Sequence, residues 1–101
     1  ESFDKDISSM RTIFAETKRI AKDVFDRFQK EGFASFRTVV LTIRFADFET
    51  KTRSQTSRVA LQTHRDLETA VLHLLMAFLD SRENPYKKAV RLIGVRVEKF
   101  I

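Results

Sequence analysis

The clearest structural pattern of this chain lies in Thr38-Val39-Val40-Leu41-Thr42-Ile43-Arg44-Phe45, with Thr50-Lys51-Thr52-Arg53-Ser54-Gln55-Thr56 shortly after it. In the first segment an apolar set alternates with a more polar set, which is the pattern of a strand with one buried face. The apolar set is Val39, Leu41, Ile43 and Phe45, and the other set is Thr38, Val40, Thr42 and Arg44. Because the link between the two segments is short, we expect a β-hairpin with strands over 37–45 and 49–59.

Two amphipathic helices are expected, one before and one after this hairpin. The first begins after Ser8 or Ser9, which can cap it, and ends before Gly32, which suits the left-handed residue after a helix. The second covers about 66–80, and Thr63 with Asp66 resembles a capping box in which Asp replaces the usual Glu. Apolar residues at spacings of three and four give each helix one apolar stripe. The stripes are Met10, Ile13, Phe14, Ile20, Ala21, Val24, Phe25 and Phe28, and Leu67, Ala70, Val71, Leu74, Leu75, Phe78 and Leu79.

The expected order of elements is a stub strand, a helix, two strands, a second helix and a last strand over about 90–100. Asn84-Pro85 closes the second helical region, because a residue before proline avoids helical torsions. Two apolar helix stripes need an apolar sheet face to cover, which leaves the other face open. The sequence therefore predicts an α+β two-layer sandwich. The start at Glu1, without a Met, indicates a domain excised from a larger protein, with its first strand truncated.

Composition sets the bounds on size, partners and compartment. The chain has 101 residues, of which 43% are hydrophobic, and this is enough for one domain with a two-layer core. Its formal net charge of +5 allows either polyanion binding or a merely solvated surface. The absence of Cys excludes disulfides and Cys-ligated zinc. No apolar run approaches the roughly 18 residues of a membrane span, so we expect no membrane partner and an intracellular protein, cytoplasmic in a prokaryote.

The candidate site lies on the expected strands and consists of side chains that suit phosphate groups. Hydroxyl, guanidinium and backbone N–H groups contact the DNA backbone without regard to sequence. Gly94 would let a phosphate approach the backbone closely, or it could mark a bulge. The side-chain parity of the second strand is ambiguous, because neither of its faces is apolar. The candidate DNA-binding residues are Thr42, Arg44, Lys51, Arg53, Ser54, Gln55, Thr56, Arg91, Gly94 and Arg96.

Three segments together resemble the C-terminal little finger domain of Y-family, DNA polymerase IV-like (DinB-type) translesion polymerases. They are Thr42-Ile43-Arg44-Phe45-Ala46-Asp47-Phe48, Thr52-Arg53-Ser54-Gln55-Thr56 and Arg91-Leu92-Ile93-Gly94-Val95-Arg96. The start, Glu1-Ser2-Phe3-Asp4-Lys5-Asp6-Ile7, is similar to the first strand of that family and its exit into the first helix. The resemblance covers residues 1–101 and implies a β-α-β-β-α-β domain with sheet order 1-4-2-3.

The resemblance also implies a function. The open sheet face would hold primer–template duplex DNA in a polymerase that replicates past DNA damage. Arg53, Thr56, Arg91 and Arg96 fall where the family places DNA contacts, whereas Gln55 stands where the family often has Arg. The catalytic carboxylates and magnesium of such a nucleotidyltransferase would lie in its palm, fingers and thumb. This domain would then have no catalytic residue and no cofactor of its own.

Other functions remain as alternatives. The same domain could be a protein-interaction module that docks a sliding clamp or a regulator through an edge strand or the Pro85 loop. An RNA-binding sheet would need exposed aromatic pairs on its strands, and we expect Phe33 and Phe36 to be loop and core residues instead. His64 and His73 have no helical register of ligands and are expected on a helix surface. A free-standing enzyme is not indicated, because no nucleophile–base pair, Gly-rich phosphate loop or paired-carboxylate motif is present.

Overall fold

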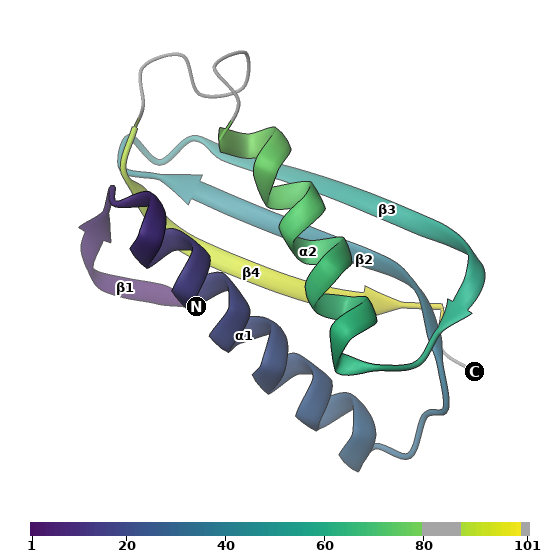
Figure 1. The fold of residues 1–101 in the computed structure, drawn as a ribbon. Coiled ribbons are helices and arrows are strands. Elements are labelled where there is room, and N and C mark those ends of the chain that lie inside the picture. Colours follow the sequence, from purple (N-terminus) through teal and green to yellow (C-terminus); the bar gives the residue numbers. More distant parts are fainter. Residues whose placement is uncertain (80–87, 100–101) are drawn as a thin grey trace.

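A four-stranded antiparallel sheet carries two helices on one face (Figure 1). The structure is a computed structural model that describes residues 1–79 and 88–99. The strand order β1-β4-β2-β3 confirms the expected topology. In chain order the elements are β1 (Ser2–Ile7), α1 (Met10–Lys30), β2 (Phe36–Phe45), β3 (Thr50–Leu61), α2 (His64–Leu79) and β4 (Val90–Glu98). The predictions for Asn84-Pro85 and Phe100 lie outside the described residues.

The ends of the helices follow the expected capping chemistry. The Ser9 hydroxyl accepts a hydrogen bond from the Thr12 amide at 3.4 Å, and Gly32 takes a φ of +83° just after α1. At the start of α2, the Asp66 amide donates to the Thr63 hydroxyl at 3.0 Å. The Asp66 carboxylate in turn accepts from the backbone amides of Gln62 and Thr63 at 3.0 and 3.2 Å. Each cap satisfies N–H groups that have no partner within the helix, so both helices begin close to where the sequence predicts.

The core lies between the two helices and the sheet face that they cover. Val39, Leu41, Ile43 and Phe45 of β2 point into it. The rings of Phe28 and Phe36 meet edge to face there with centroids 5.2 Å apart. Thr17 is buried in α1, where its hydroxyl donates to the Ile13 carbonyl at 2.7 Å. The strand side of the core is Phe36, Val39, Leu41, Ile43, Phe45, Val90, Ile93 and Val97. No helix in the described part of the chain is long and apolar enough to cross a membrane.

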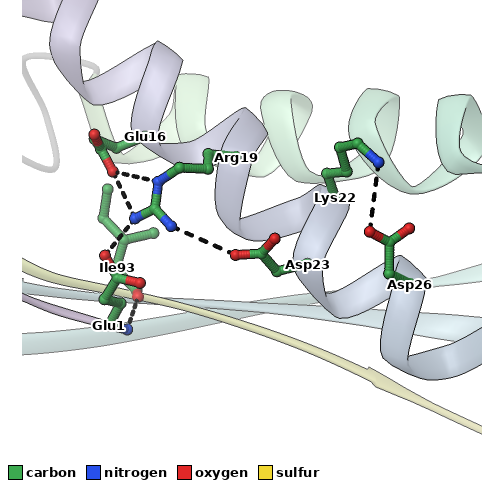
Figure 2. A network of polar contacts seen from close by, with 7 residues as sticks. All are labelled: Glu1, Glu16, Arg19, Lys22, Asp23, Asp26 and Ile93. Atoms are coloured by element: carbon green, nitrogen blue, oxygen red, sulfur yellow. Dashed lines mark hydrogen bonds and ion pairs between the residues drawn. The ribbon is translucent and has the colours of Figure 1, made fainter.

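The first strand is more complete than the stub that we expected. It pairs with β4 at Ser2↔Leu92 and Ile7↔Val90, with an irregularity between these pairs. The Glu1 backbone nitrogen donates to the Ile93 carbonyl, while its carboxylate pairs with Arg19 of α1 (Figure 2). Sequence pattern alone underestimates β1, because its strand conformation depends on pairing and on this link to α1.

β3 contains an irregular segment near its C-terminal end. Between the pairs Phe36↔Leu61 and Thr38↔Thr56, β2 contains only Arg37 whereas β3 contains residues 57–60. The Arg37 guanidinium donates to the carbonyls of Ser57 and Arg58, both at 3.0 Å, and so holds the extra residues in place. Val59 lies in this bulge with 67% of its surface exposed.

Candidate nucleic-acid interface

The sheet face away from the helices carries mostly short side chains. Residues directly opposite each other in antiparallel strands share a face, so the register identifies its members. Across β2 and β3 the pairs on this open face are Thr38↔Thr56, Val40↔Ser54, Thr42↔Thr52 and Arg44↔Thr50. Across β2 and β4 they are Thr38↔Glu98, Val40↔Arg96, Thr42↔Gly94 and Arg44↔Leu92. The open face therefore brings together six predicted site residues, which are Thr42, Arg44, Ser54, Thr56, Gly94 and Arg96.

Hydroxyl groups on β2 and β3 form cross-strand pairs on this face. The hydroxyls of Thr38 and Thr56 lie 2.9 Å apart, and those of Thr42 and Thr52 lie 3.1 Å apart. In each pair one hydroxyl donates to the other, and the accepting hydroxyl keeps its own O–H to donate to an external acceptor such as a phosphate oxygen.

Two arginines give the open face its positive charge. Arg44 donates from Nε to the Thr50 hydroxyl at 2.9 Å, which leaves its terminal nitrogens for other contacts. The Arg96 side chain is 67% exposed, and its Nε lies 3.2 Å from the Glu98 carboxylate. Because Leu92 lies opposite Arg44 and Arg96 follows four residues later, the two arginines are set about 13 Å apart along the sheet. They lie on one face, as a surface that contacts several phosphates requires.

Gly94 lies in the middle of this face and not at a bulge. The register of β4 against β2 is regular from Glu98 to Leu92, so the alternative interpretation of Gly94 as a bulge residue is wrong. A Cβ atom at this position would lie 3.7 Å from the Thr42 Cβ atom, which is an ordinary contact. The fold could therefore accept a methyl group here, and its absence leaves the backbone open to a ligand.

Arg91 lies at the irregular end of β4. The register shifts between Arg44↔Leu92 and Phe45↔Val90, which makes Arg91 the extra residue of a bulge. Its guanidinium carbon lies 4.5 Å from the centre of the Phe48 ring, in the turn between β2 and β3. Arg91 is therefore positioned at the turn end of the sheet, beyond the regular rows of the open face.

Three predicted site residues lie on the opposite, helix-bearing face. Gln55, Arg53 and Lys51 pair with Val39, Leu41 and Ile43, which point into the core. The Gln55 amide oxygen lies 2.9 Å from Nδ1 of His73 on α2, and the Lys51 ammonium lies 3.6 Å from the Glu49 carboxylate. The register thus resolves the ambiguous parity of β3 and separates these side chains from the arginines of the open face.

Asp47, Glu49 and His64 lie outside this face and contact other side chains. Lys88 lies 2.8 Å from the Asp47 carboxylate and 3.5 Å from that of Glu49. The hydrogen bond from Lys88 lowers the pKa of Asp47 below its ordinary value, and Asp47 raises the pKa of Lys88. His64 packs on Phe25 with ring centroids 5.9 Å apart. Within the described ranges, no group of three His, Asp or Glu side chains could hold a metal ion.

Reasoning from sequence misses two residues of this region. Glu98 lies on the open face beside Arg96, and the i, i+2 spacing of the two residues on a strand could have revealed it. Phe48 is exposed in the turn next to Arg91, and its place in a turn gives no periodic pattern that could have indicated a role for the ring. The pair Phe33 and Phe36 behaves as expected, because Phe33 lies before β2 and Phe36 is fully buried.

Comparisons with known proteins identify relatives along the whole chain. A family profile described as "impB/mucB/samB family C-terminal domain" matches residues 1–101. A DNA polymerase IV of Leptospira interrogans is 30% identical over 96 residues, which cover 93% of this chain and 26% of that protein. DNA polymerase IV 2 of Agrobacterium fabrum is 27% identical over 100 residues, which cover 99% of this chain and 26% of that protein. The chain spans about a quarter of the length of these curated relatives.

Solved structures share the same fold. A structure described as "Complex of beta-clamp processivity factor and little finger domain of PolIV" matches with a TM-score of 0.71 at 18% identity, covering 96% of this chain and 81% of that chain. A structure described as "Insertion ternary complex of Dbh DNA polymerase" matches with a TM-score of 0.67 at 14% identity, covering 99% of this chain and 27% of that chain. Both likenesses show a common arrangement of helices and strands.

Proposed function

The chain belongs to the impB/mucB/samB family as its C-terminal domain, the little finger domain of Y-family DNA polymerases, and we propose that it holds primer–template duplex DNA on its open sheet face. The observation that carries this proposal is that Arg44 and Arg96 lie on one uncovered face, with hydroxyl side chains and Gly94 between them. The proposed role is sequence-independent binding during synthesis past DNA damage.

The geometry supports contact with phosphates more than with base edges. Phosphate oxygens accept hydrogen bonds from guanidinium, hydroxyl and backbone N–H groups, and such contacts carry no sequence information. In the part of the chain that the structure describes, the regular rows of this face contain no Asn or Gln side chain, the types that read adenine most directly. A polymerase that copies damaged DNA is served by a grip that ignores base identity.

The chemistry of the parent enzyme is a further part of the proposal. We place the catalytic carboxylates and magnesium of the DNA-directed DNA polymerase in its other domains, and this domain positions the duplex for them. The polymerase would act inside the cell, in the cytoplasm of a prokaryote. This chain is proposed to raise the residence time of DNA on the enzyme without touching the reacting atoms.

Charge-removing variants on the two faces test the role of the open face. Titration of the chain with a fluorescent primer–template duplex at low salt should show binding that Arg96→Ala and Arg44→Ala each weaken by up to about fivefold, the range of an exposed ion pair. Lys18→Ala on α1 removes the same charge from the helix-bearing side and serves as the matched control. It should leave the affinity close to that of the wild type.

Three results would contradict this function. One is the absence of any duplex binding at low salt. Another is an equal loss for Lys18→Ala and Arg96→Ala, which would mean that net charge alone attracts the DNA. Duplexes of unrelated sequence should bind alike, and a strong sequence preference would also count against the proposal.

Docking of a sliding clamp is the second candidate, favoured by the exposed bulge of the edge strand β3. Val59 is 67% exposed there, and Arg37 holds the bulge carbonyls in a fixed shape. A rigid protrusion at a sheet edge suits contact with a protein surface, and one structure with the same fold is described as a complex of a beta-clamp processivity factor with a little finger domain. A clamp bound at this bulge should tolerate Arg96→Ala, whereas DNA bound on the open face should not, so one set of variants separates the two roles.

A further inference from the structure

Phe48 stands out because the fold gains little from an aromatic ring at this position. The residue has a φ of +68°, a left-handed conformation that is unfavourable for a bulky L-residue and that Gly or Asn adopts more easily. Its side chain is also 65% exposed, so the ring contributes little burial to the core. Local strain together with an exposed aromatic indicates a ligand more than a structural role.

Arg91 supports the ring from one side. Its guanidinium carbon lies 4.5 Å from the ring centre, within the range of a cation–π contact. The bulge in β4 supplies this arginine as an extra residue, and bulges often redirect a side chain toward a site. The exposed remainder of the ring is thus held in a defined orientation at the turn end of the sheet.

We propose that Phe48, backed by Arg91, stacks on an unpaired nucleobase of a DNA strand that continues beyond the duplex. This inference rests on the proposed function, because only Phe45 separates the turn from Arg44, the last open-face residue of β2. A strand leaving the open face at this end would reach the ring next. Stacking on an aromatic side chain accepts every base, which agrees with sequence-independent binding.

The two carboxylates next to Phe48 repel a DNA strand only weakly, because both are paired with a cation. Asp47 and Glu49 flank the ring in sequence, but both carboxylates pair with Lys88, at 2.8 and 3.5 Å. Together with Arg91, these side chains leave the turn with balanced charge. The affinity of this site should therefore come from stacking and depend weakly on salt.

The test compares a blunt duplex, the same duplex with a single-stranded overhang, and the overhang strand alone. For the wild type the overhang should strengthen binding by about tenfold, the effect of one stacked base. Phe48→Gly should abolish this gain and leave blunt-duplex affinity unchanged. Glycine relieves the positive φ, so this variant should unfold at no lower urea concentration than the wild type. Phe48→Trp should keep the gain.

Two controls separate base stacking from apolar contact and from phosphate contact. Val59→Ala removes apolar surface from an equally exposed residue elsewhere and should keep the overhang gain. An overhang of abasic nucleotides, which keeps its phosphates, should lose it. Equal binding of blunt and overhang duplexes by the wild type, or an unchanged gain in Phe48→Gly, would overturn the inference. Phe48-dependent binding of the single strand without any duplex binding would refute the proposed function but support this site.

Discussion

At the scale of single residues, substitutions of the two glycines should affect different properties, DNA affinity at one and stability at the other. Gly94 has space for a Cβ atom 3.7 Å from that of Thr42, whereas Gly32 has a φ of +83° that any other residue adopts with strain. Gly94→Ala should therefore keep or raise the free energy of unfolding, by up to about 1 kcal/mol, because Gly weakens strands. Its affinity for duplex DNA should fall, since the methyl group keeps phosphates away from the backbone.

Gly32→Ala is the matched control with the opposite pattern. It should lower the free energy of unfolding by about 1 kcal/mol, because the left-handed conformation penalises a Cβ atom, and leave duplex affinity unchanged. Urea unfolding and fluorescence anisotropy measure the two quantities. Wild-type affinity in Gly94→Ala would show that DNA does not approach the backbone at this residue.

The start of α2 makes a prediction about pH at the scale of secondary-structure elements. Hydrogen bonds from the backbone amides of Gln62 and Thr63 lower the pKa of Asp66 below its ordinary value of 3.8. A lowered pKa in the folded state means that the ionised group stabilises the fold above pH 3.8 and that this contribution is lost as the pH falls below it. Asp66→Ala should cost about 1 kcal/mol of unfolding free energy at neutral pH, and this difference should shrink in acid.

Asp23→Ala provides the comparison for Asp66. Asp23 makes an exposed ion pair with Arg19 at 3.4 Å, which contributes only about 0.5 kcal/mol. Urea unfolding at several pH values, with each variant compared with the wild type, isolates the cap from other titrating groups. A difference for Asp66→Ala that stayed constant down to about pH 3 would mean that the cap does not depend on the ionised carboxylate.

The elements also show how far the sequence predicts this structure. Periodic apolar residues locate both helices and β2, because their patterns record which side is buried. β3 has no such pattern, and only its register against β2 places Lys51, Arg53 and Gln55 on the helix-bearing face. β1 is underestimated for the same reason, since Phe3 and Ile7 are its only apolar residues. Long-range pairing, which local sequence does not encode, determines the composition of the candidate site.

The charge distribution of the whole molecule predicts a shallow salt dependence of DNA binding. The net charge of +5 is spread over both faces, whereas the open face has Arg44 and Arg96 for phosphates. Since each neutralised phosphate contributes about −0.9 to the slope of log K against log salt concentration, two arginine contacts give an expected slope of about −2. Titrations at several salt concentrations measure it.

A steeper slope would change the proposed mode of binding. Basic residues of the helix-bearing face would then contribute, and Lys51→Ala or Arg53→Ala should reduce the slope. With the slope that we expect, neither of these substitutions should change it. The measurement thereby decides whether DNA is held by one face of the sheet or wraps around the β3 edge.

The bulge that Arg37 holds in β3 also affects the tendency of the protein to self-associate. An outer strand with a regular ladder of free amides and carbonyls is a template on which another chain can grow a sheet. Residues 57–60 break that ladder, and the two hydrogen bonds from Arg37 hold the break in place. This bulge should therefore disfavour polymerisation of the protein through β3, which is its longest strand and lies at an edge of the sheet.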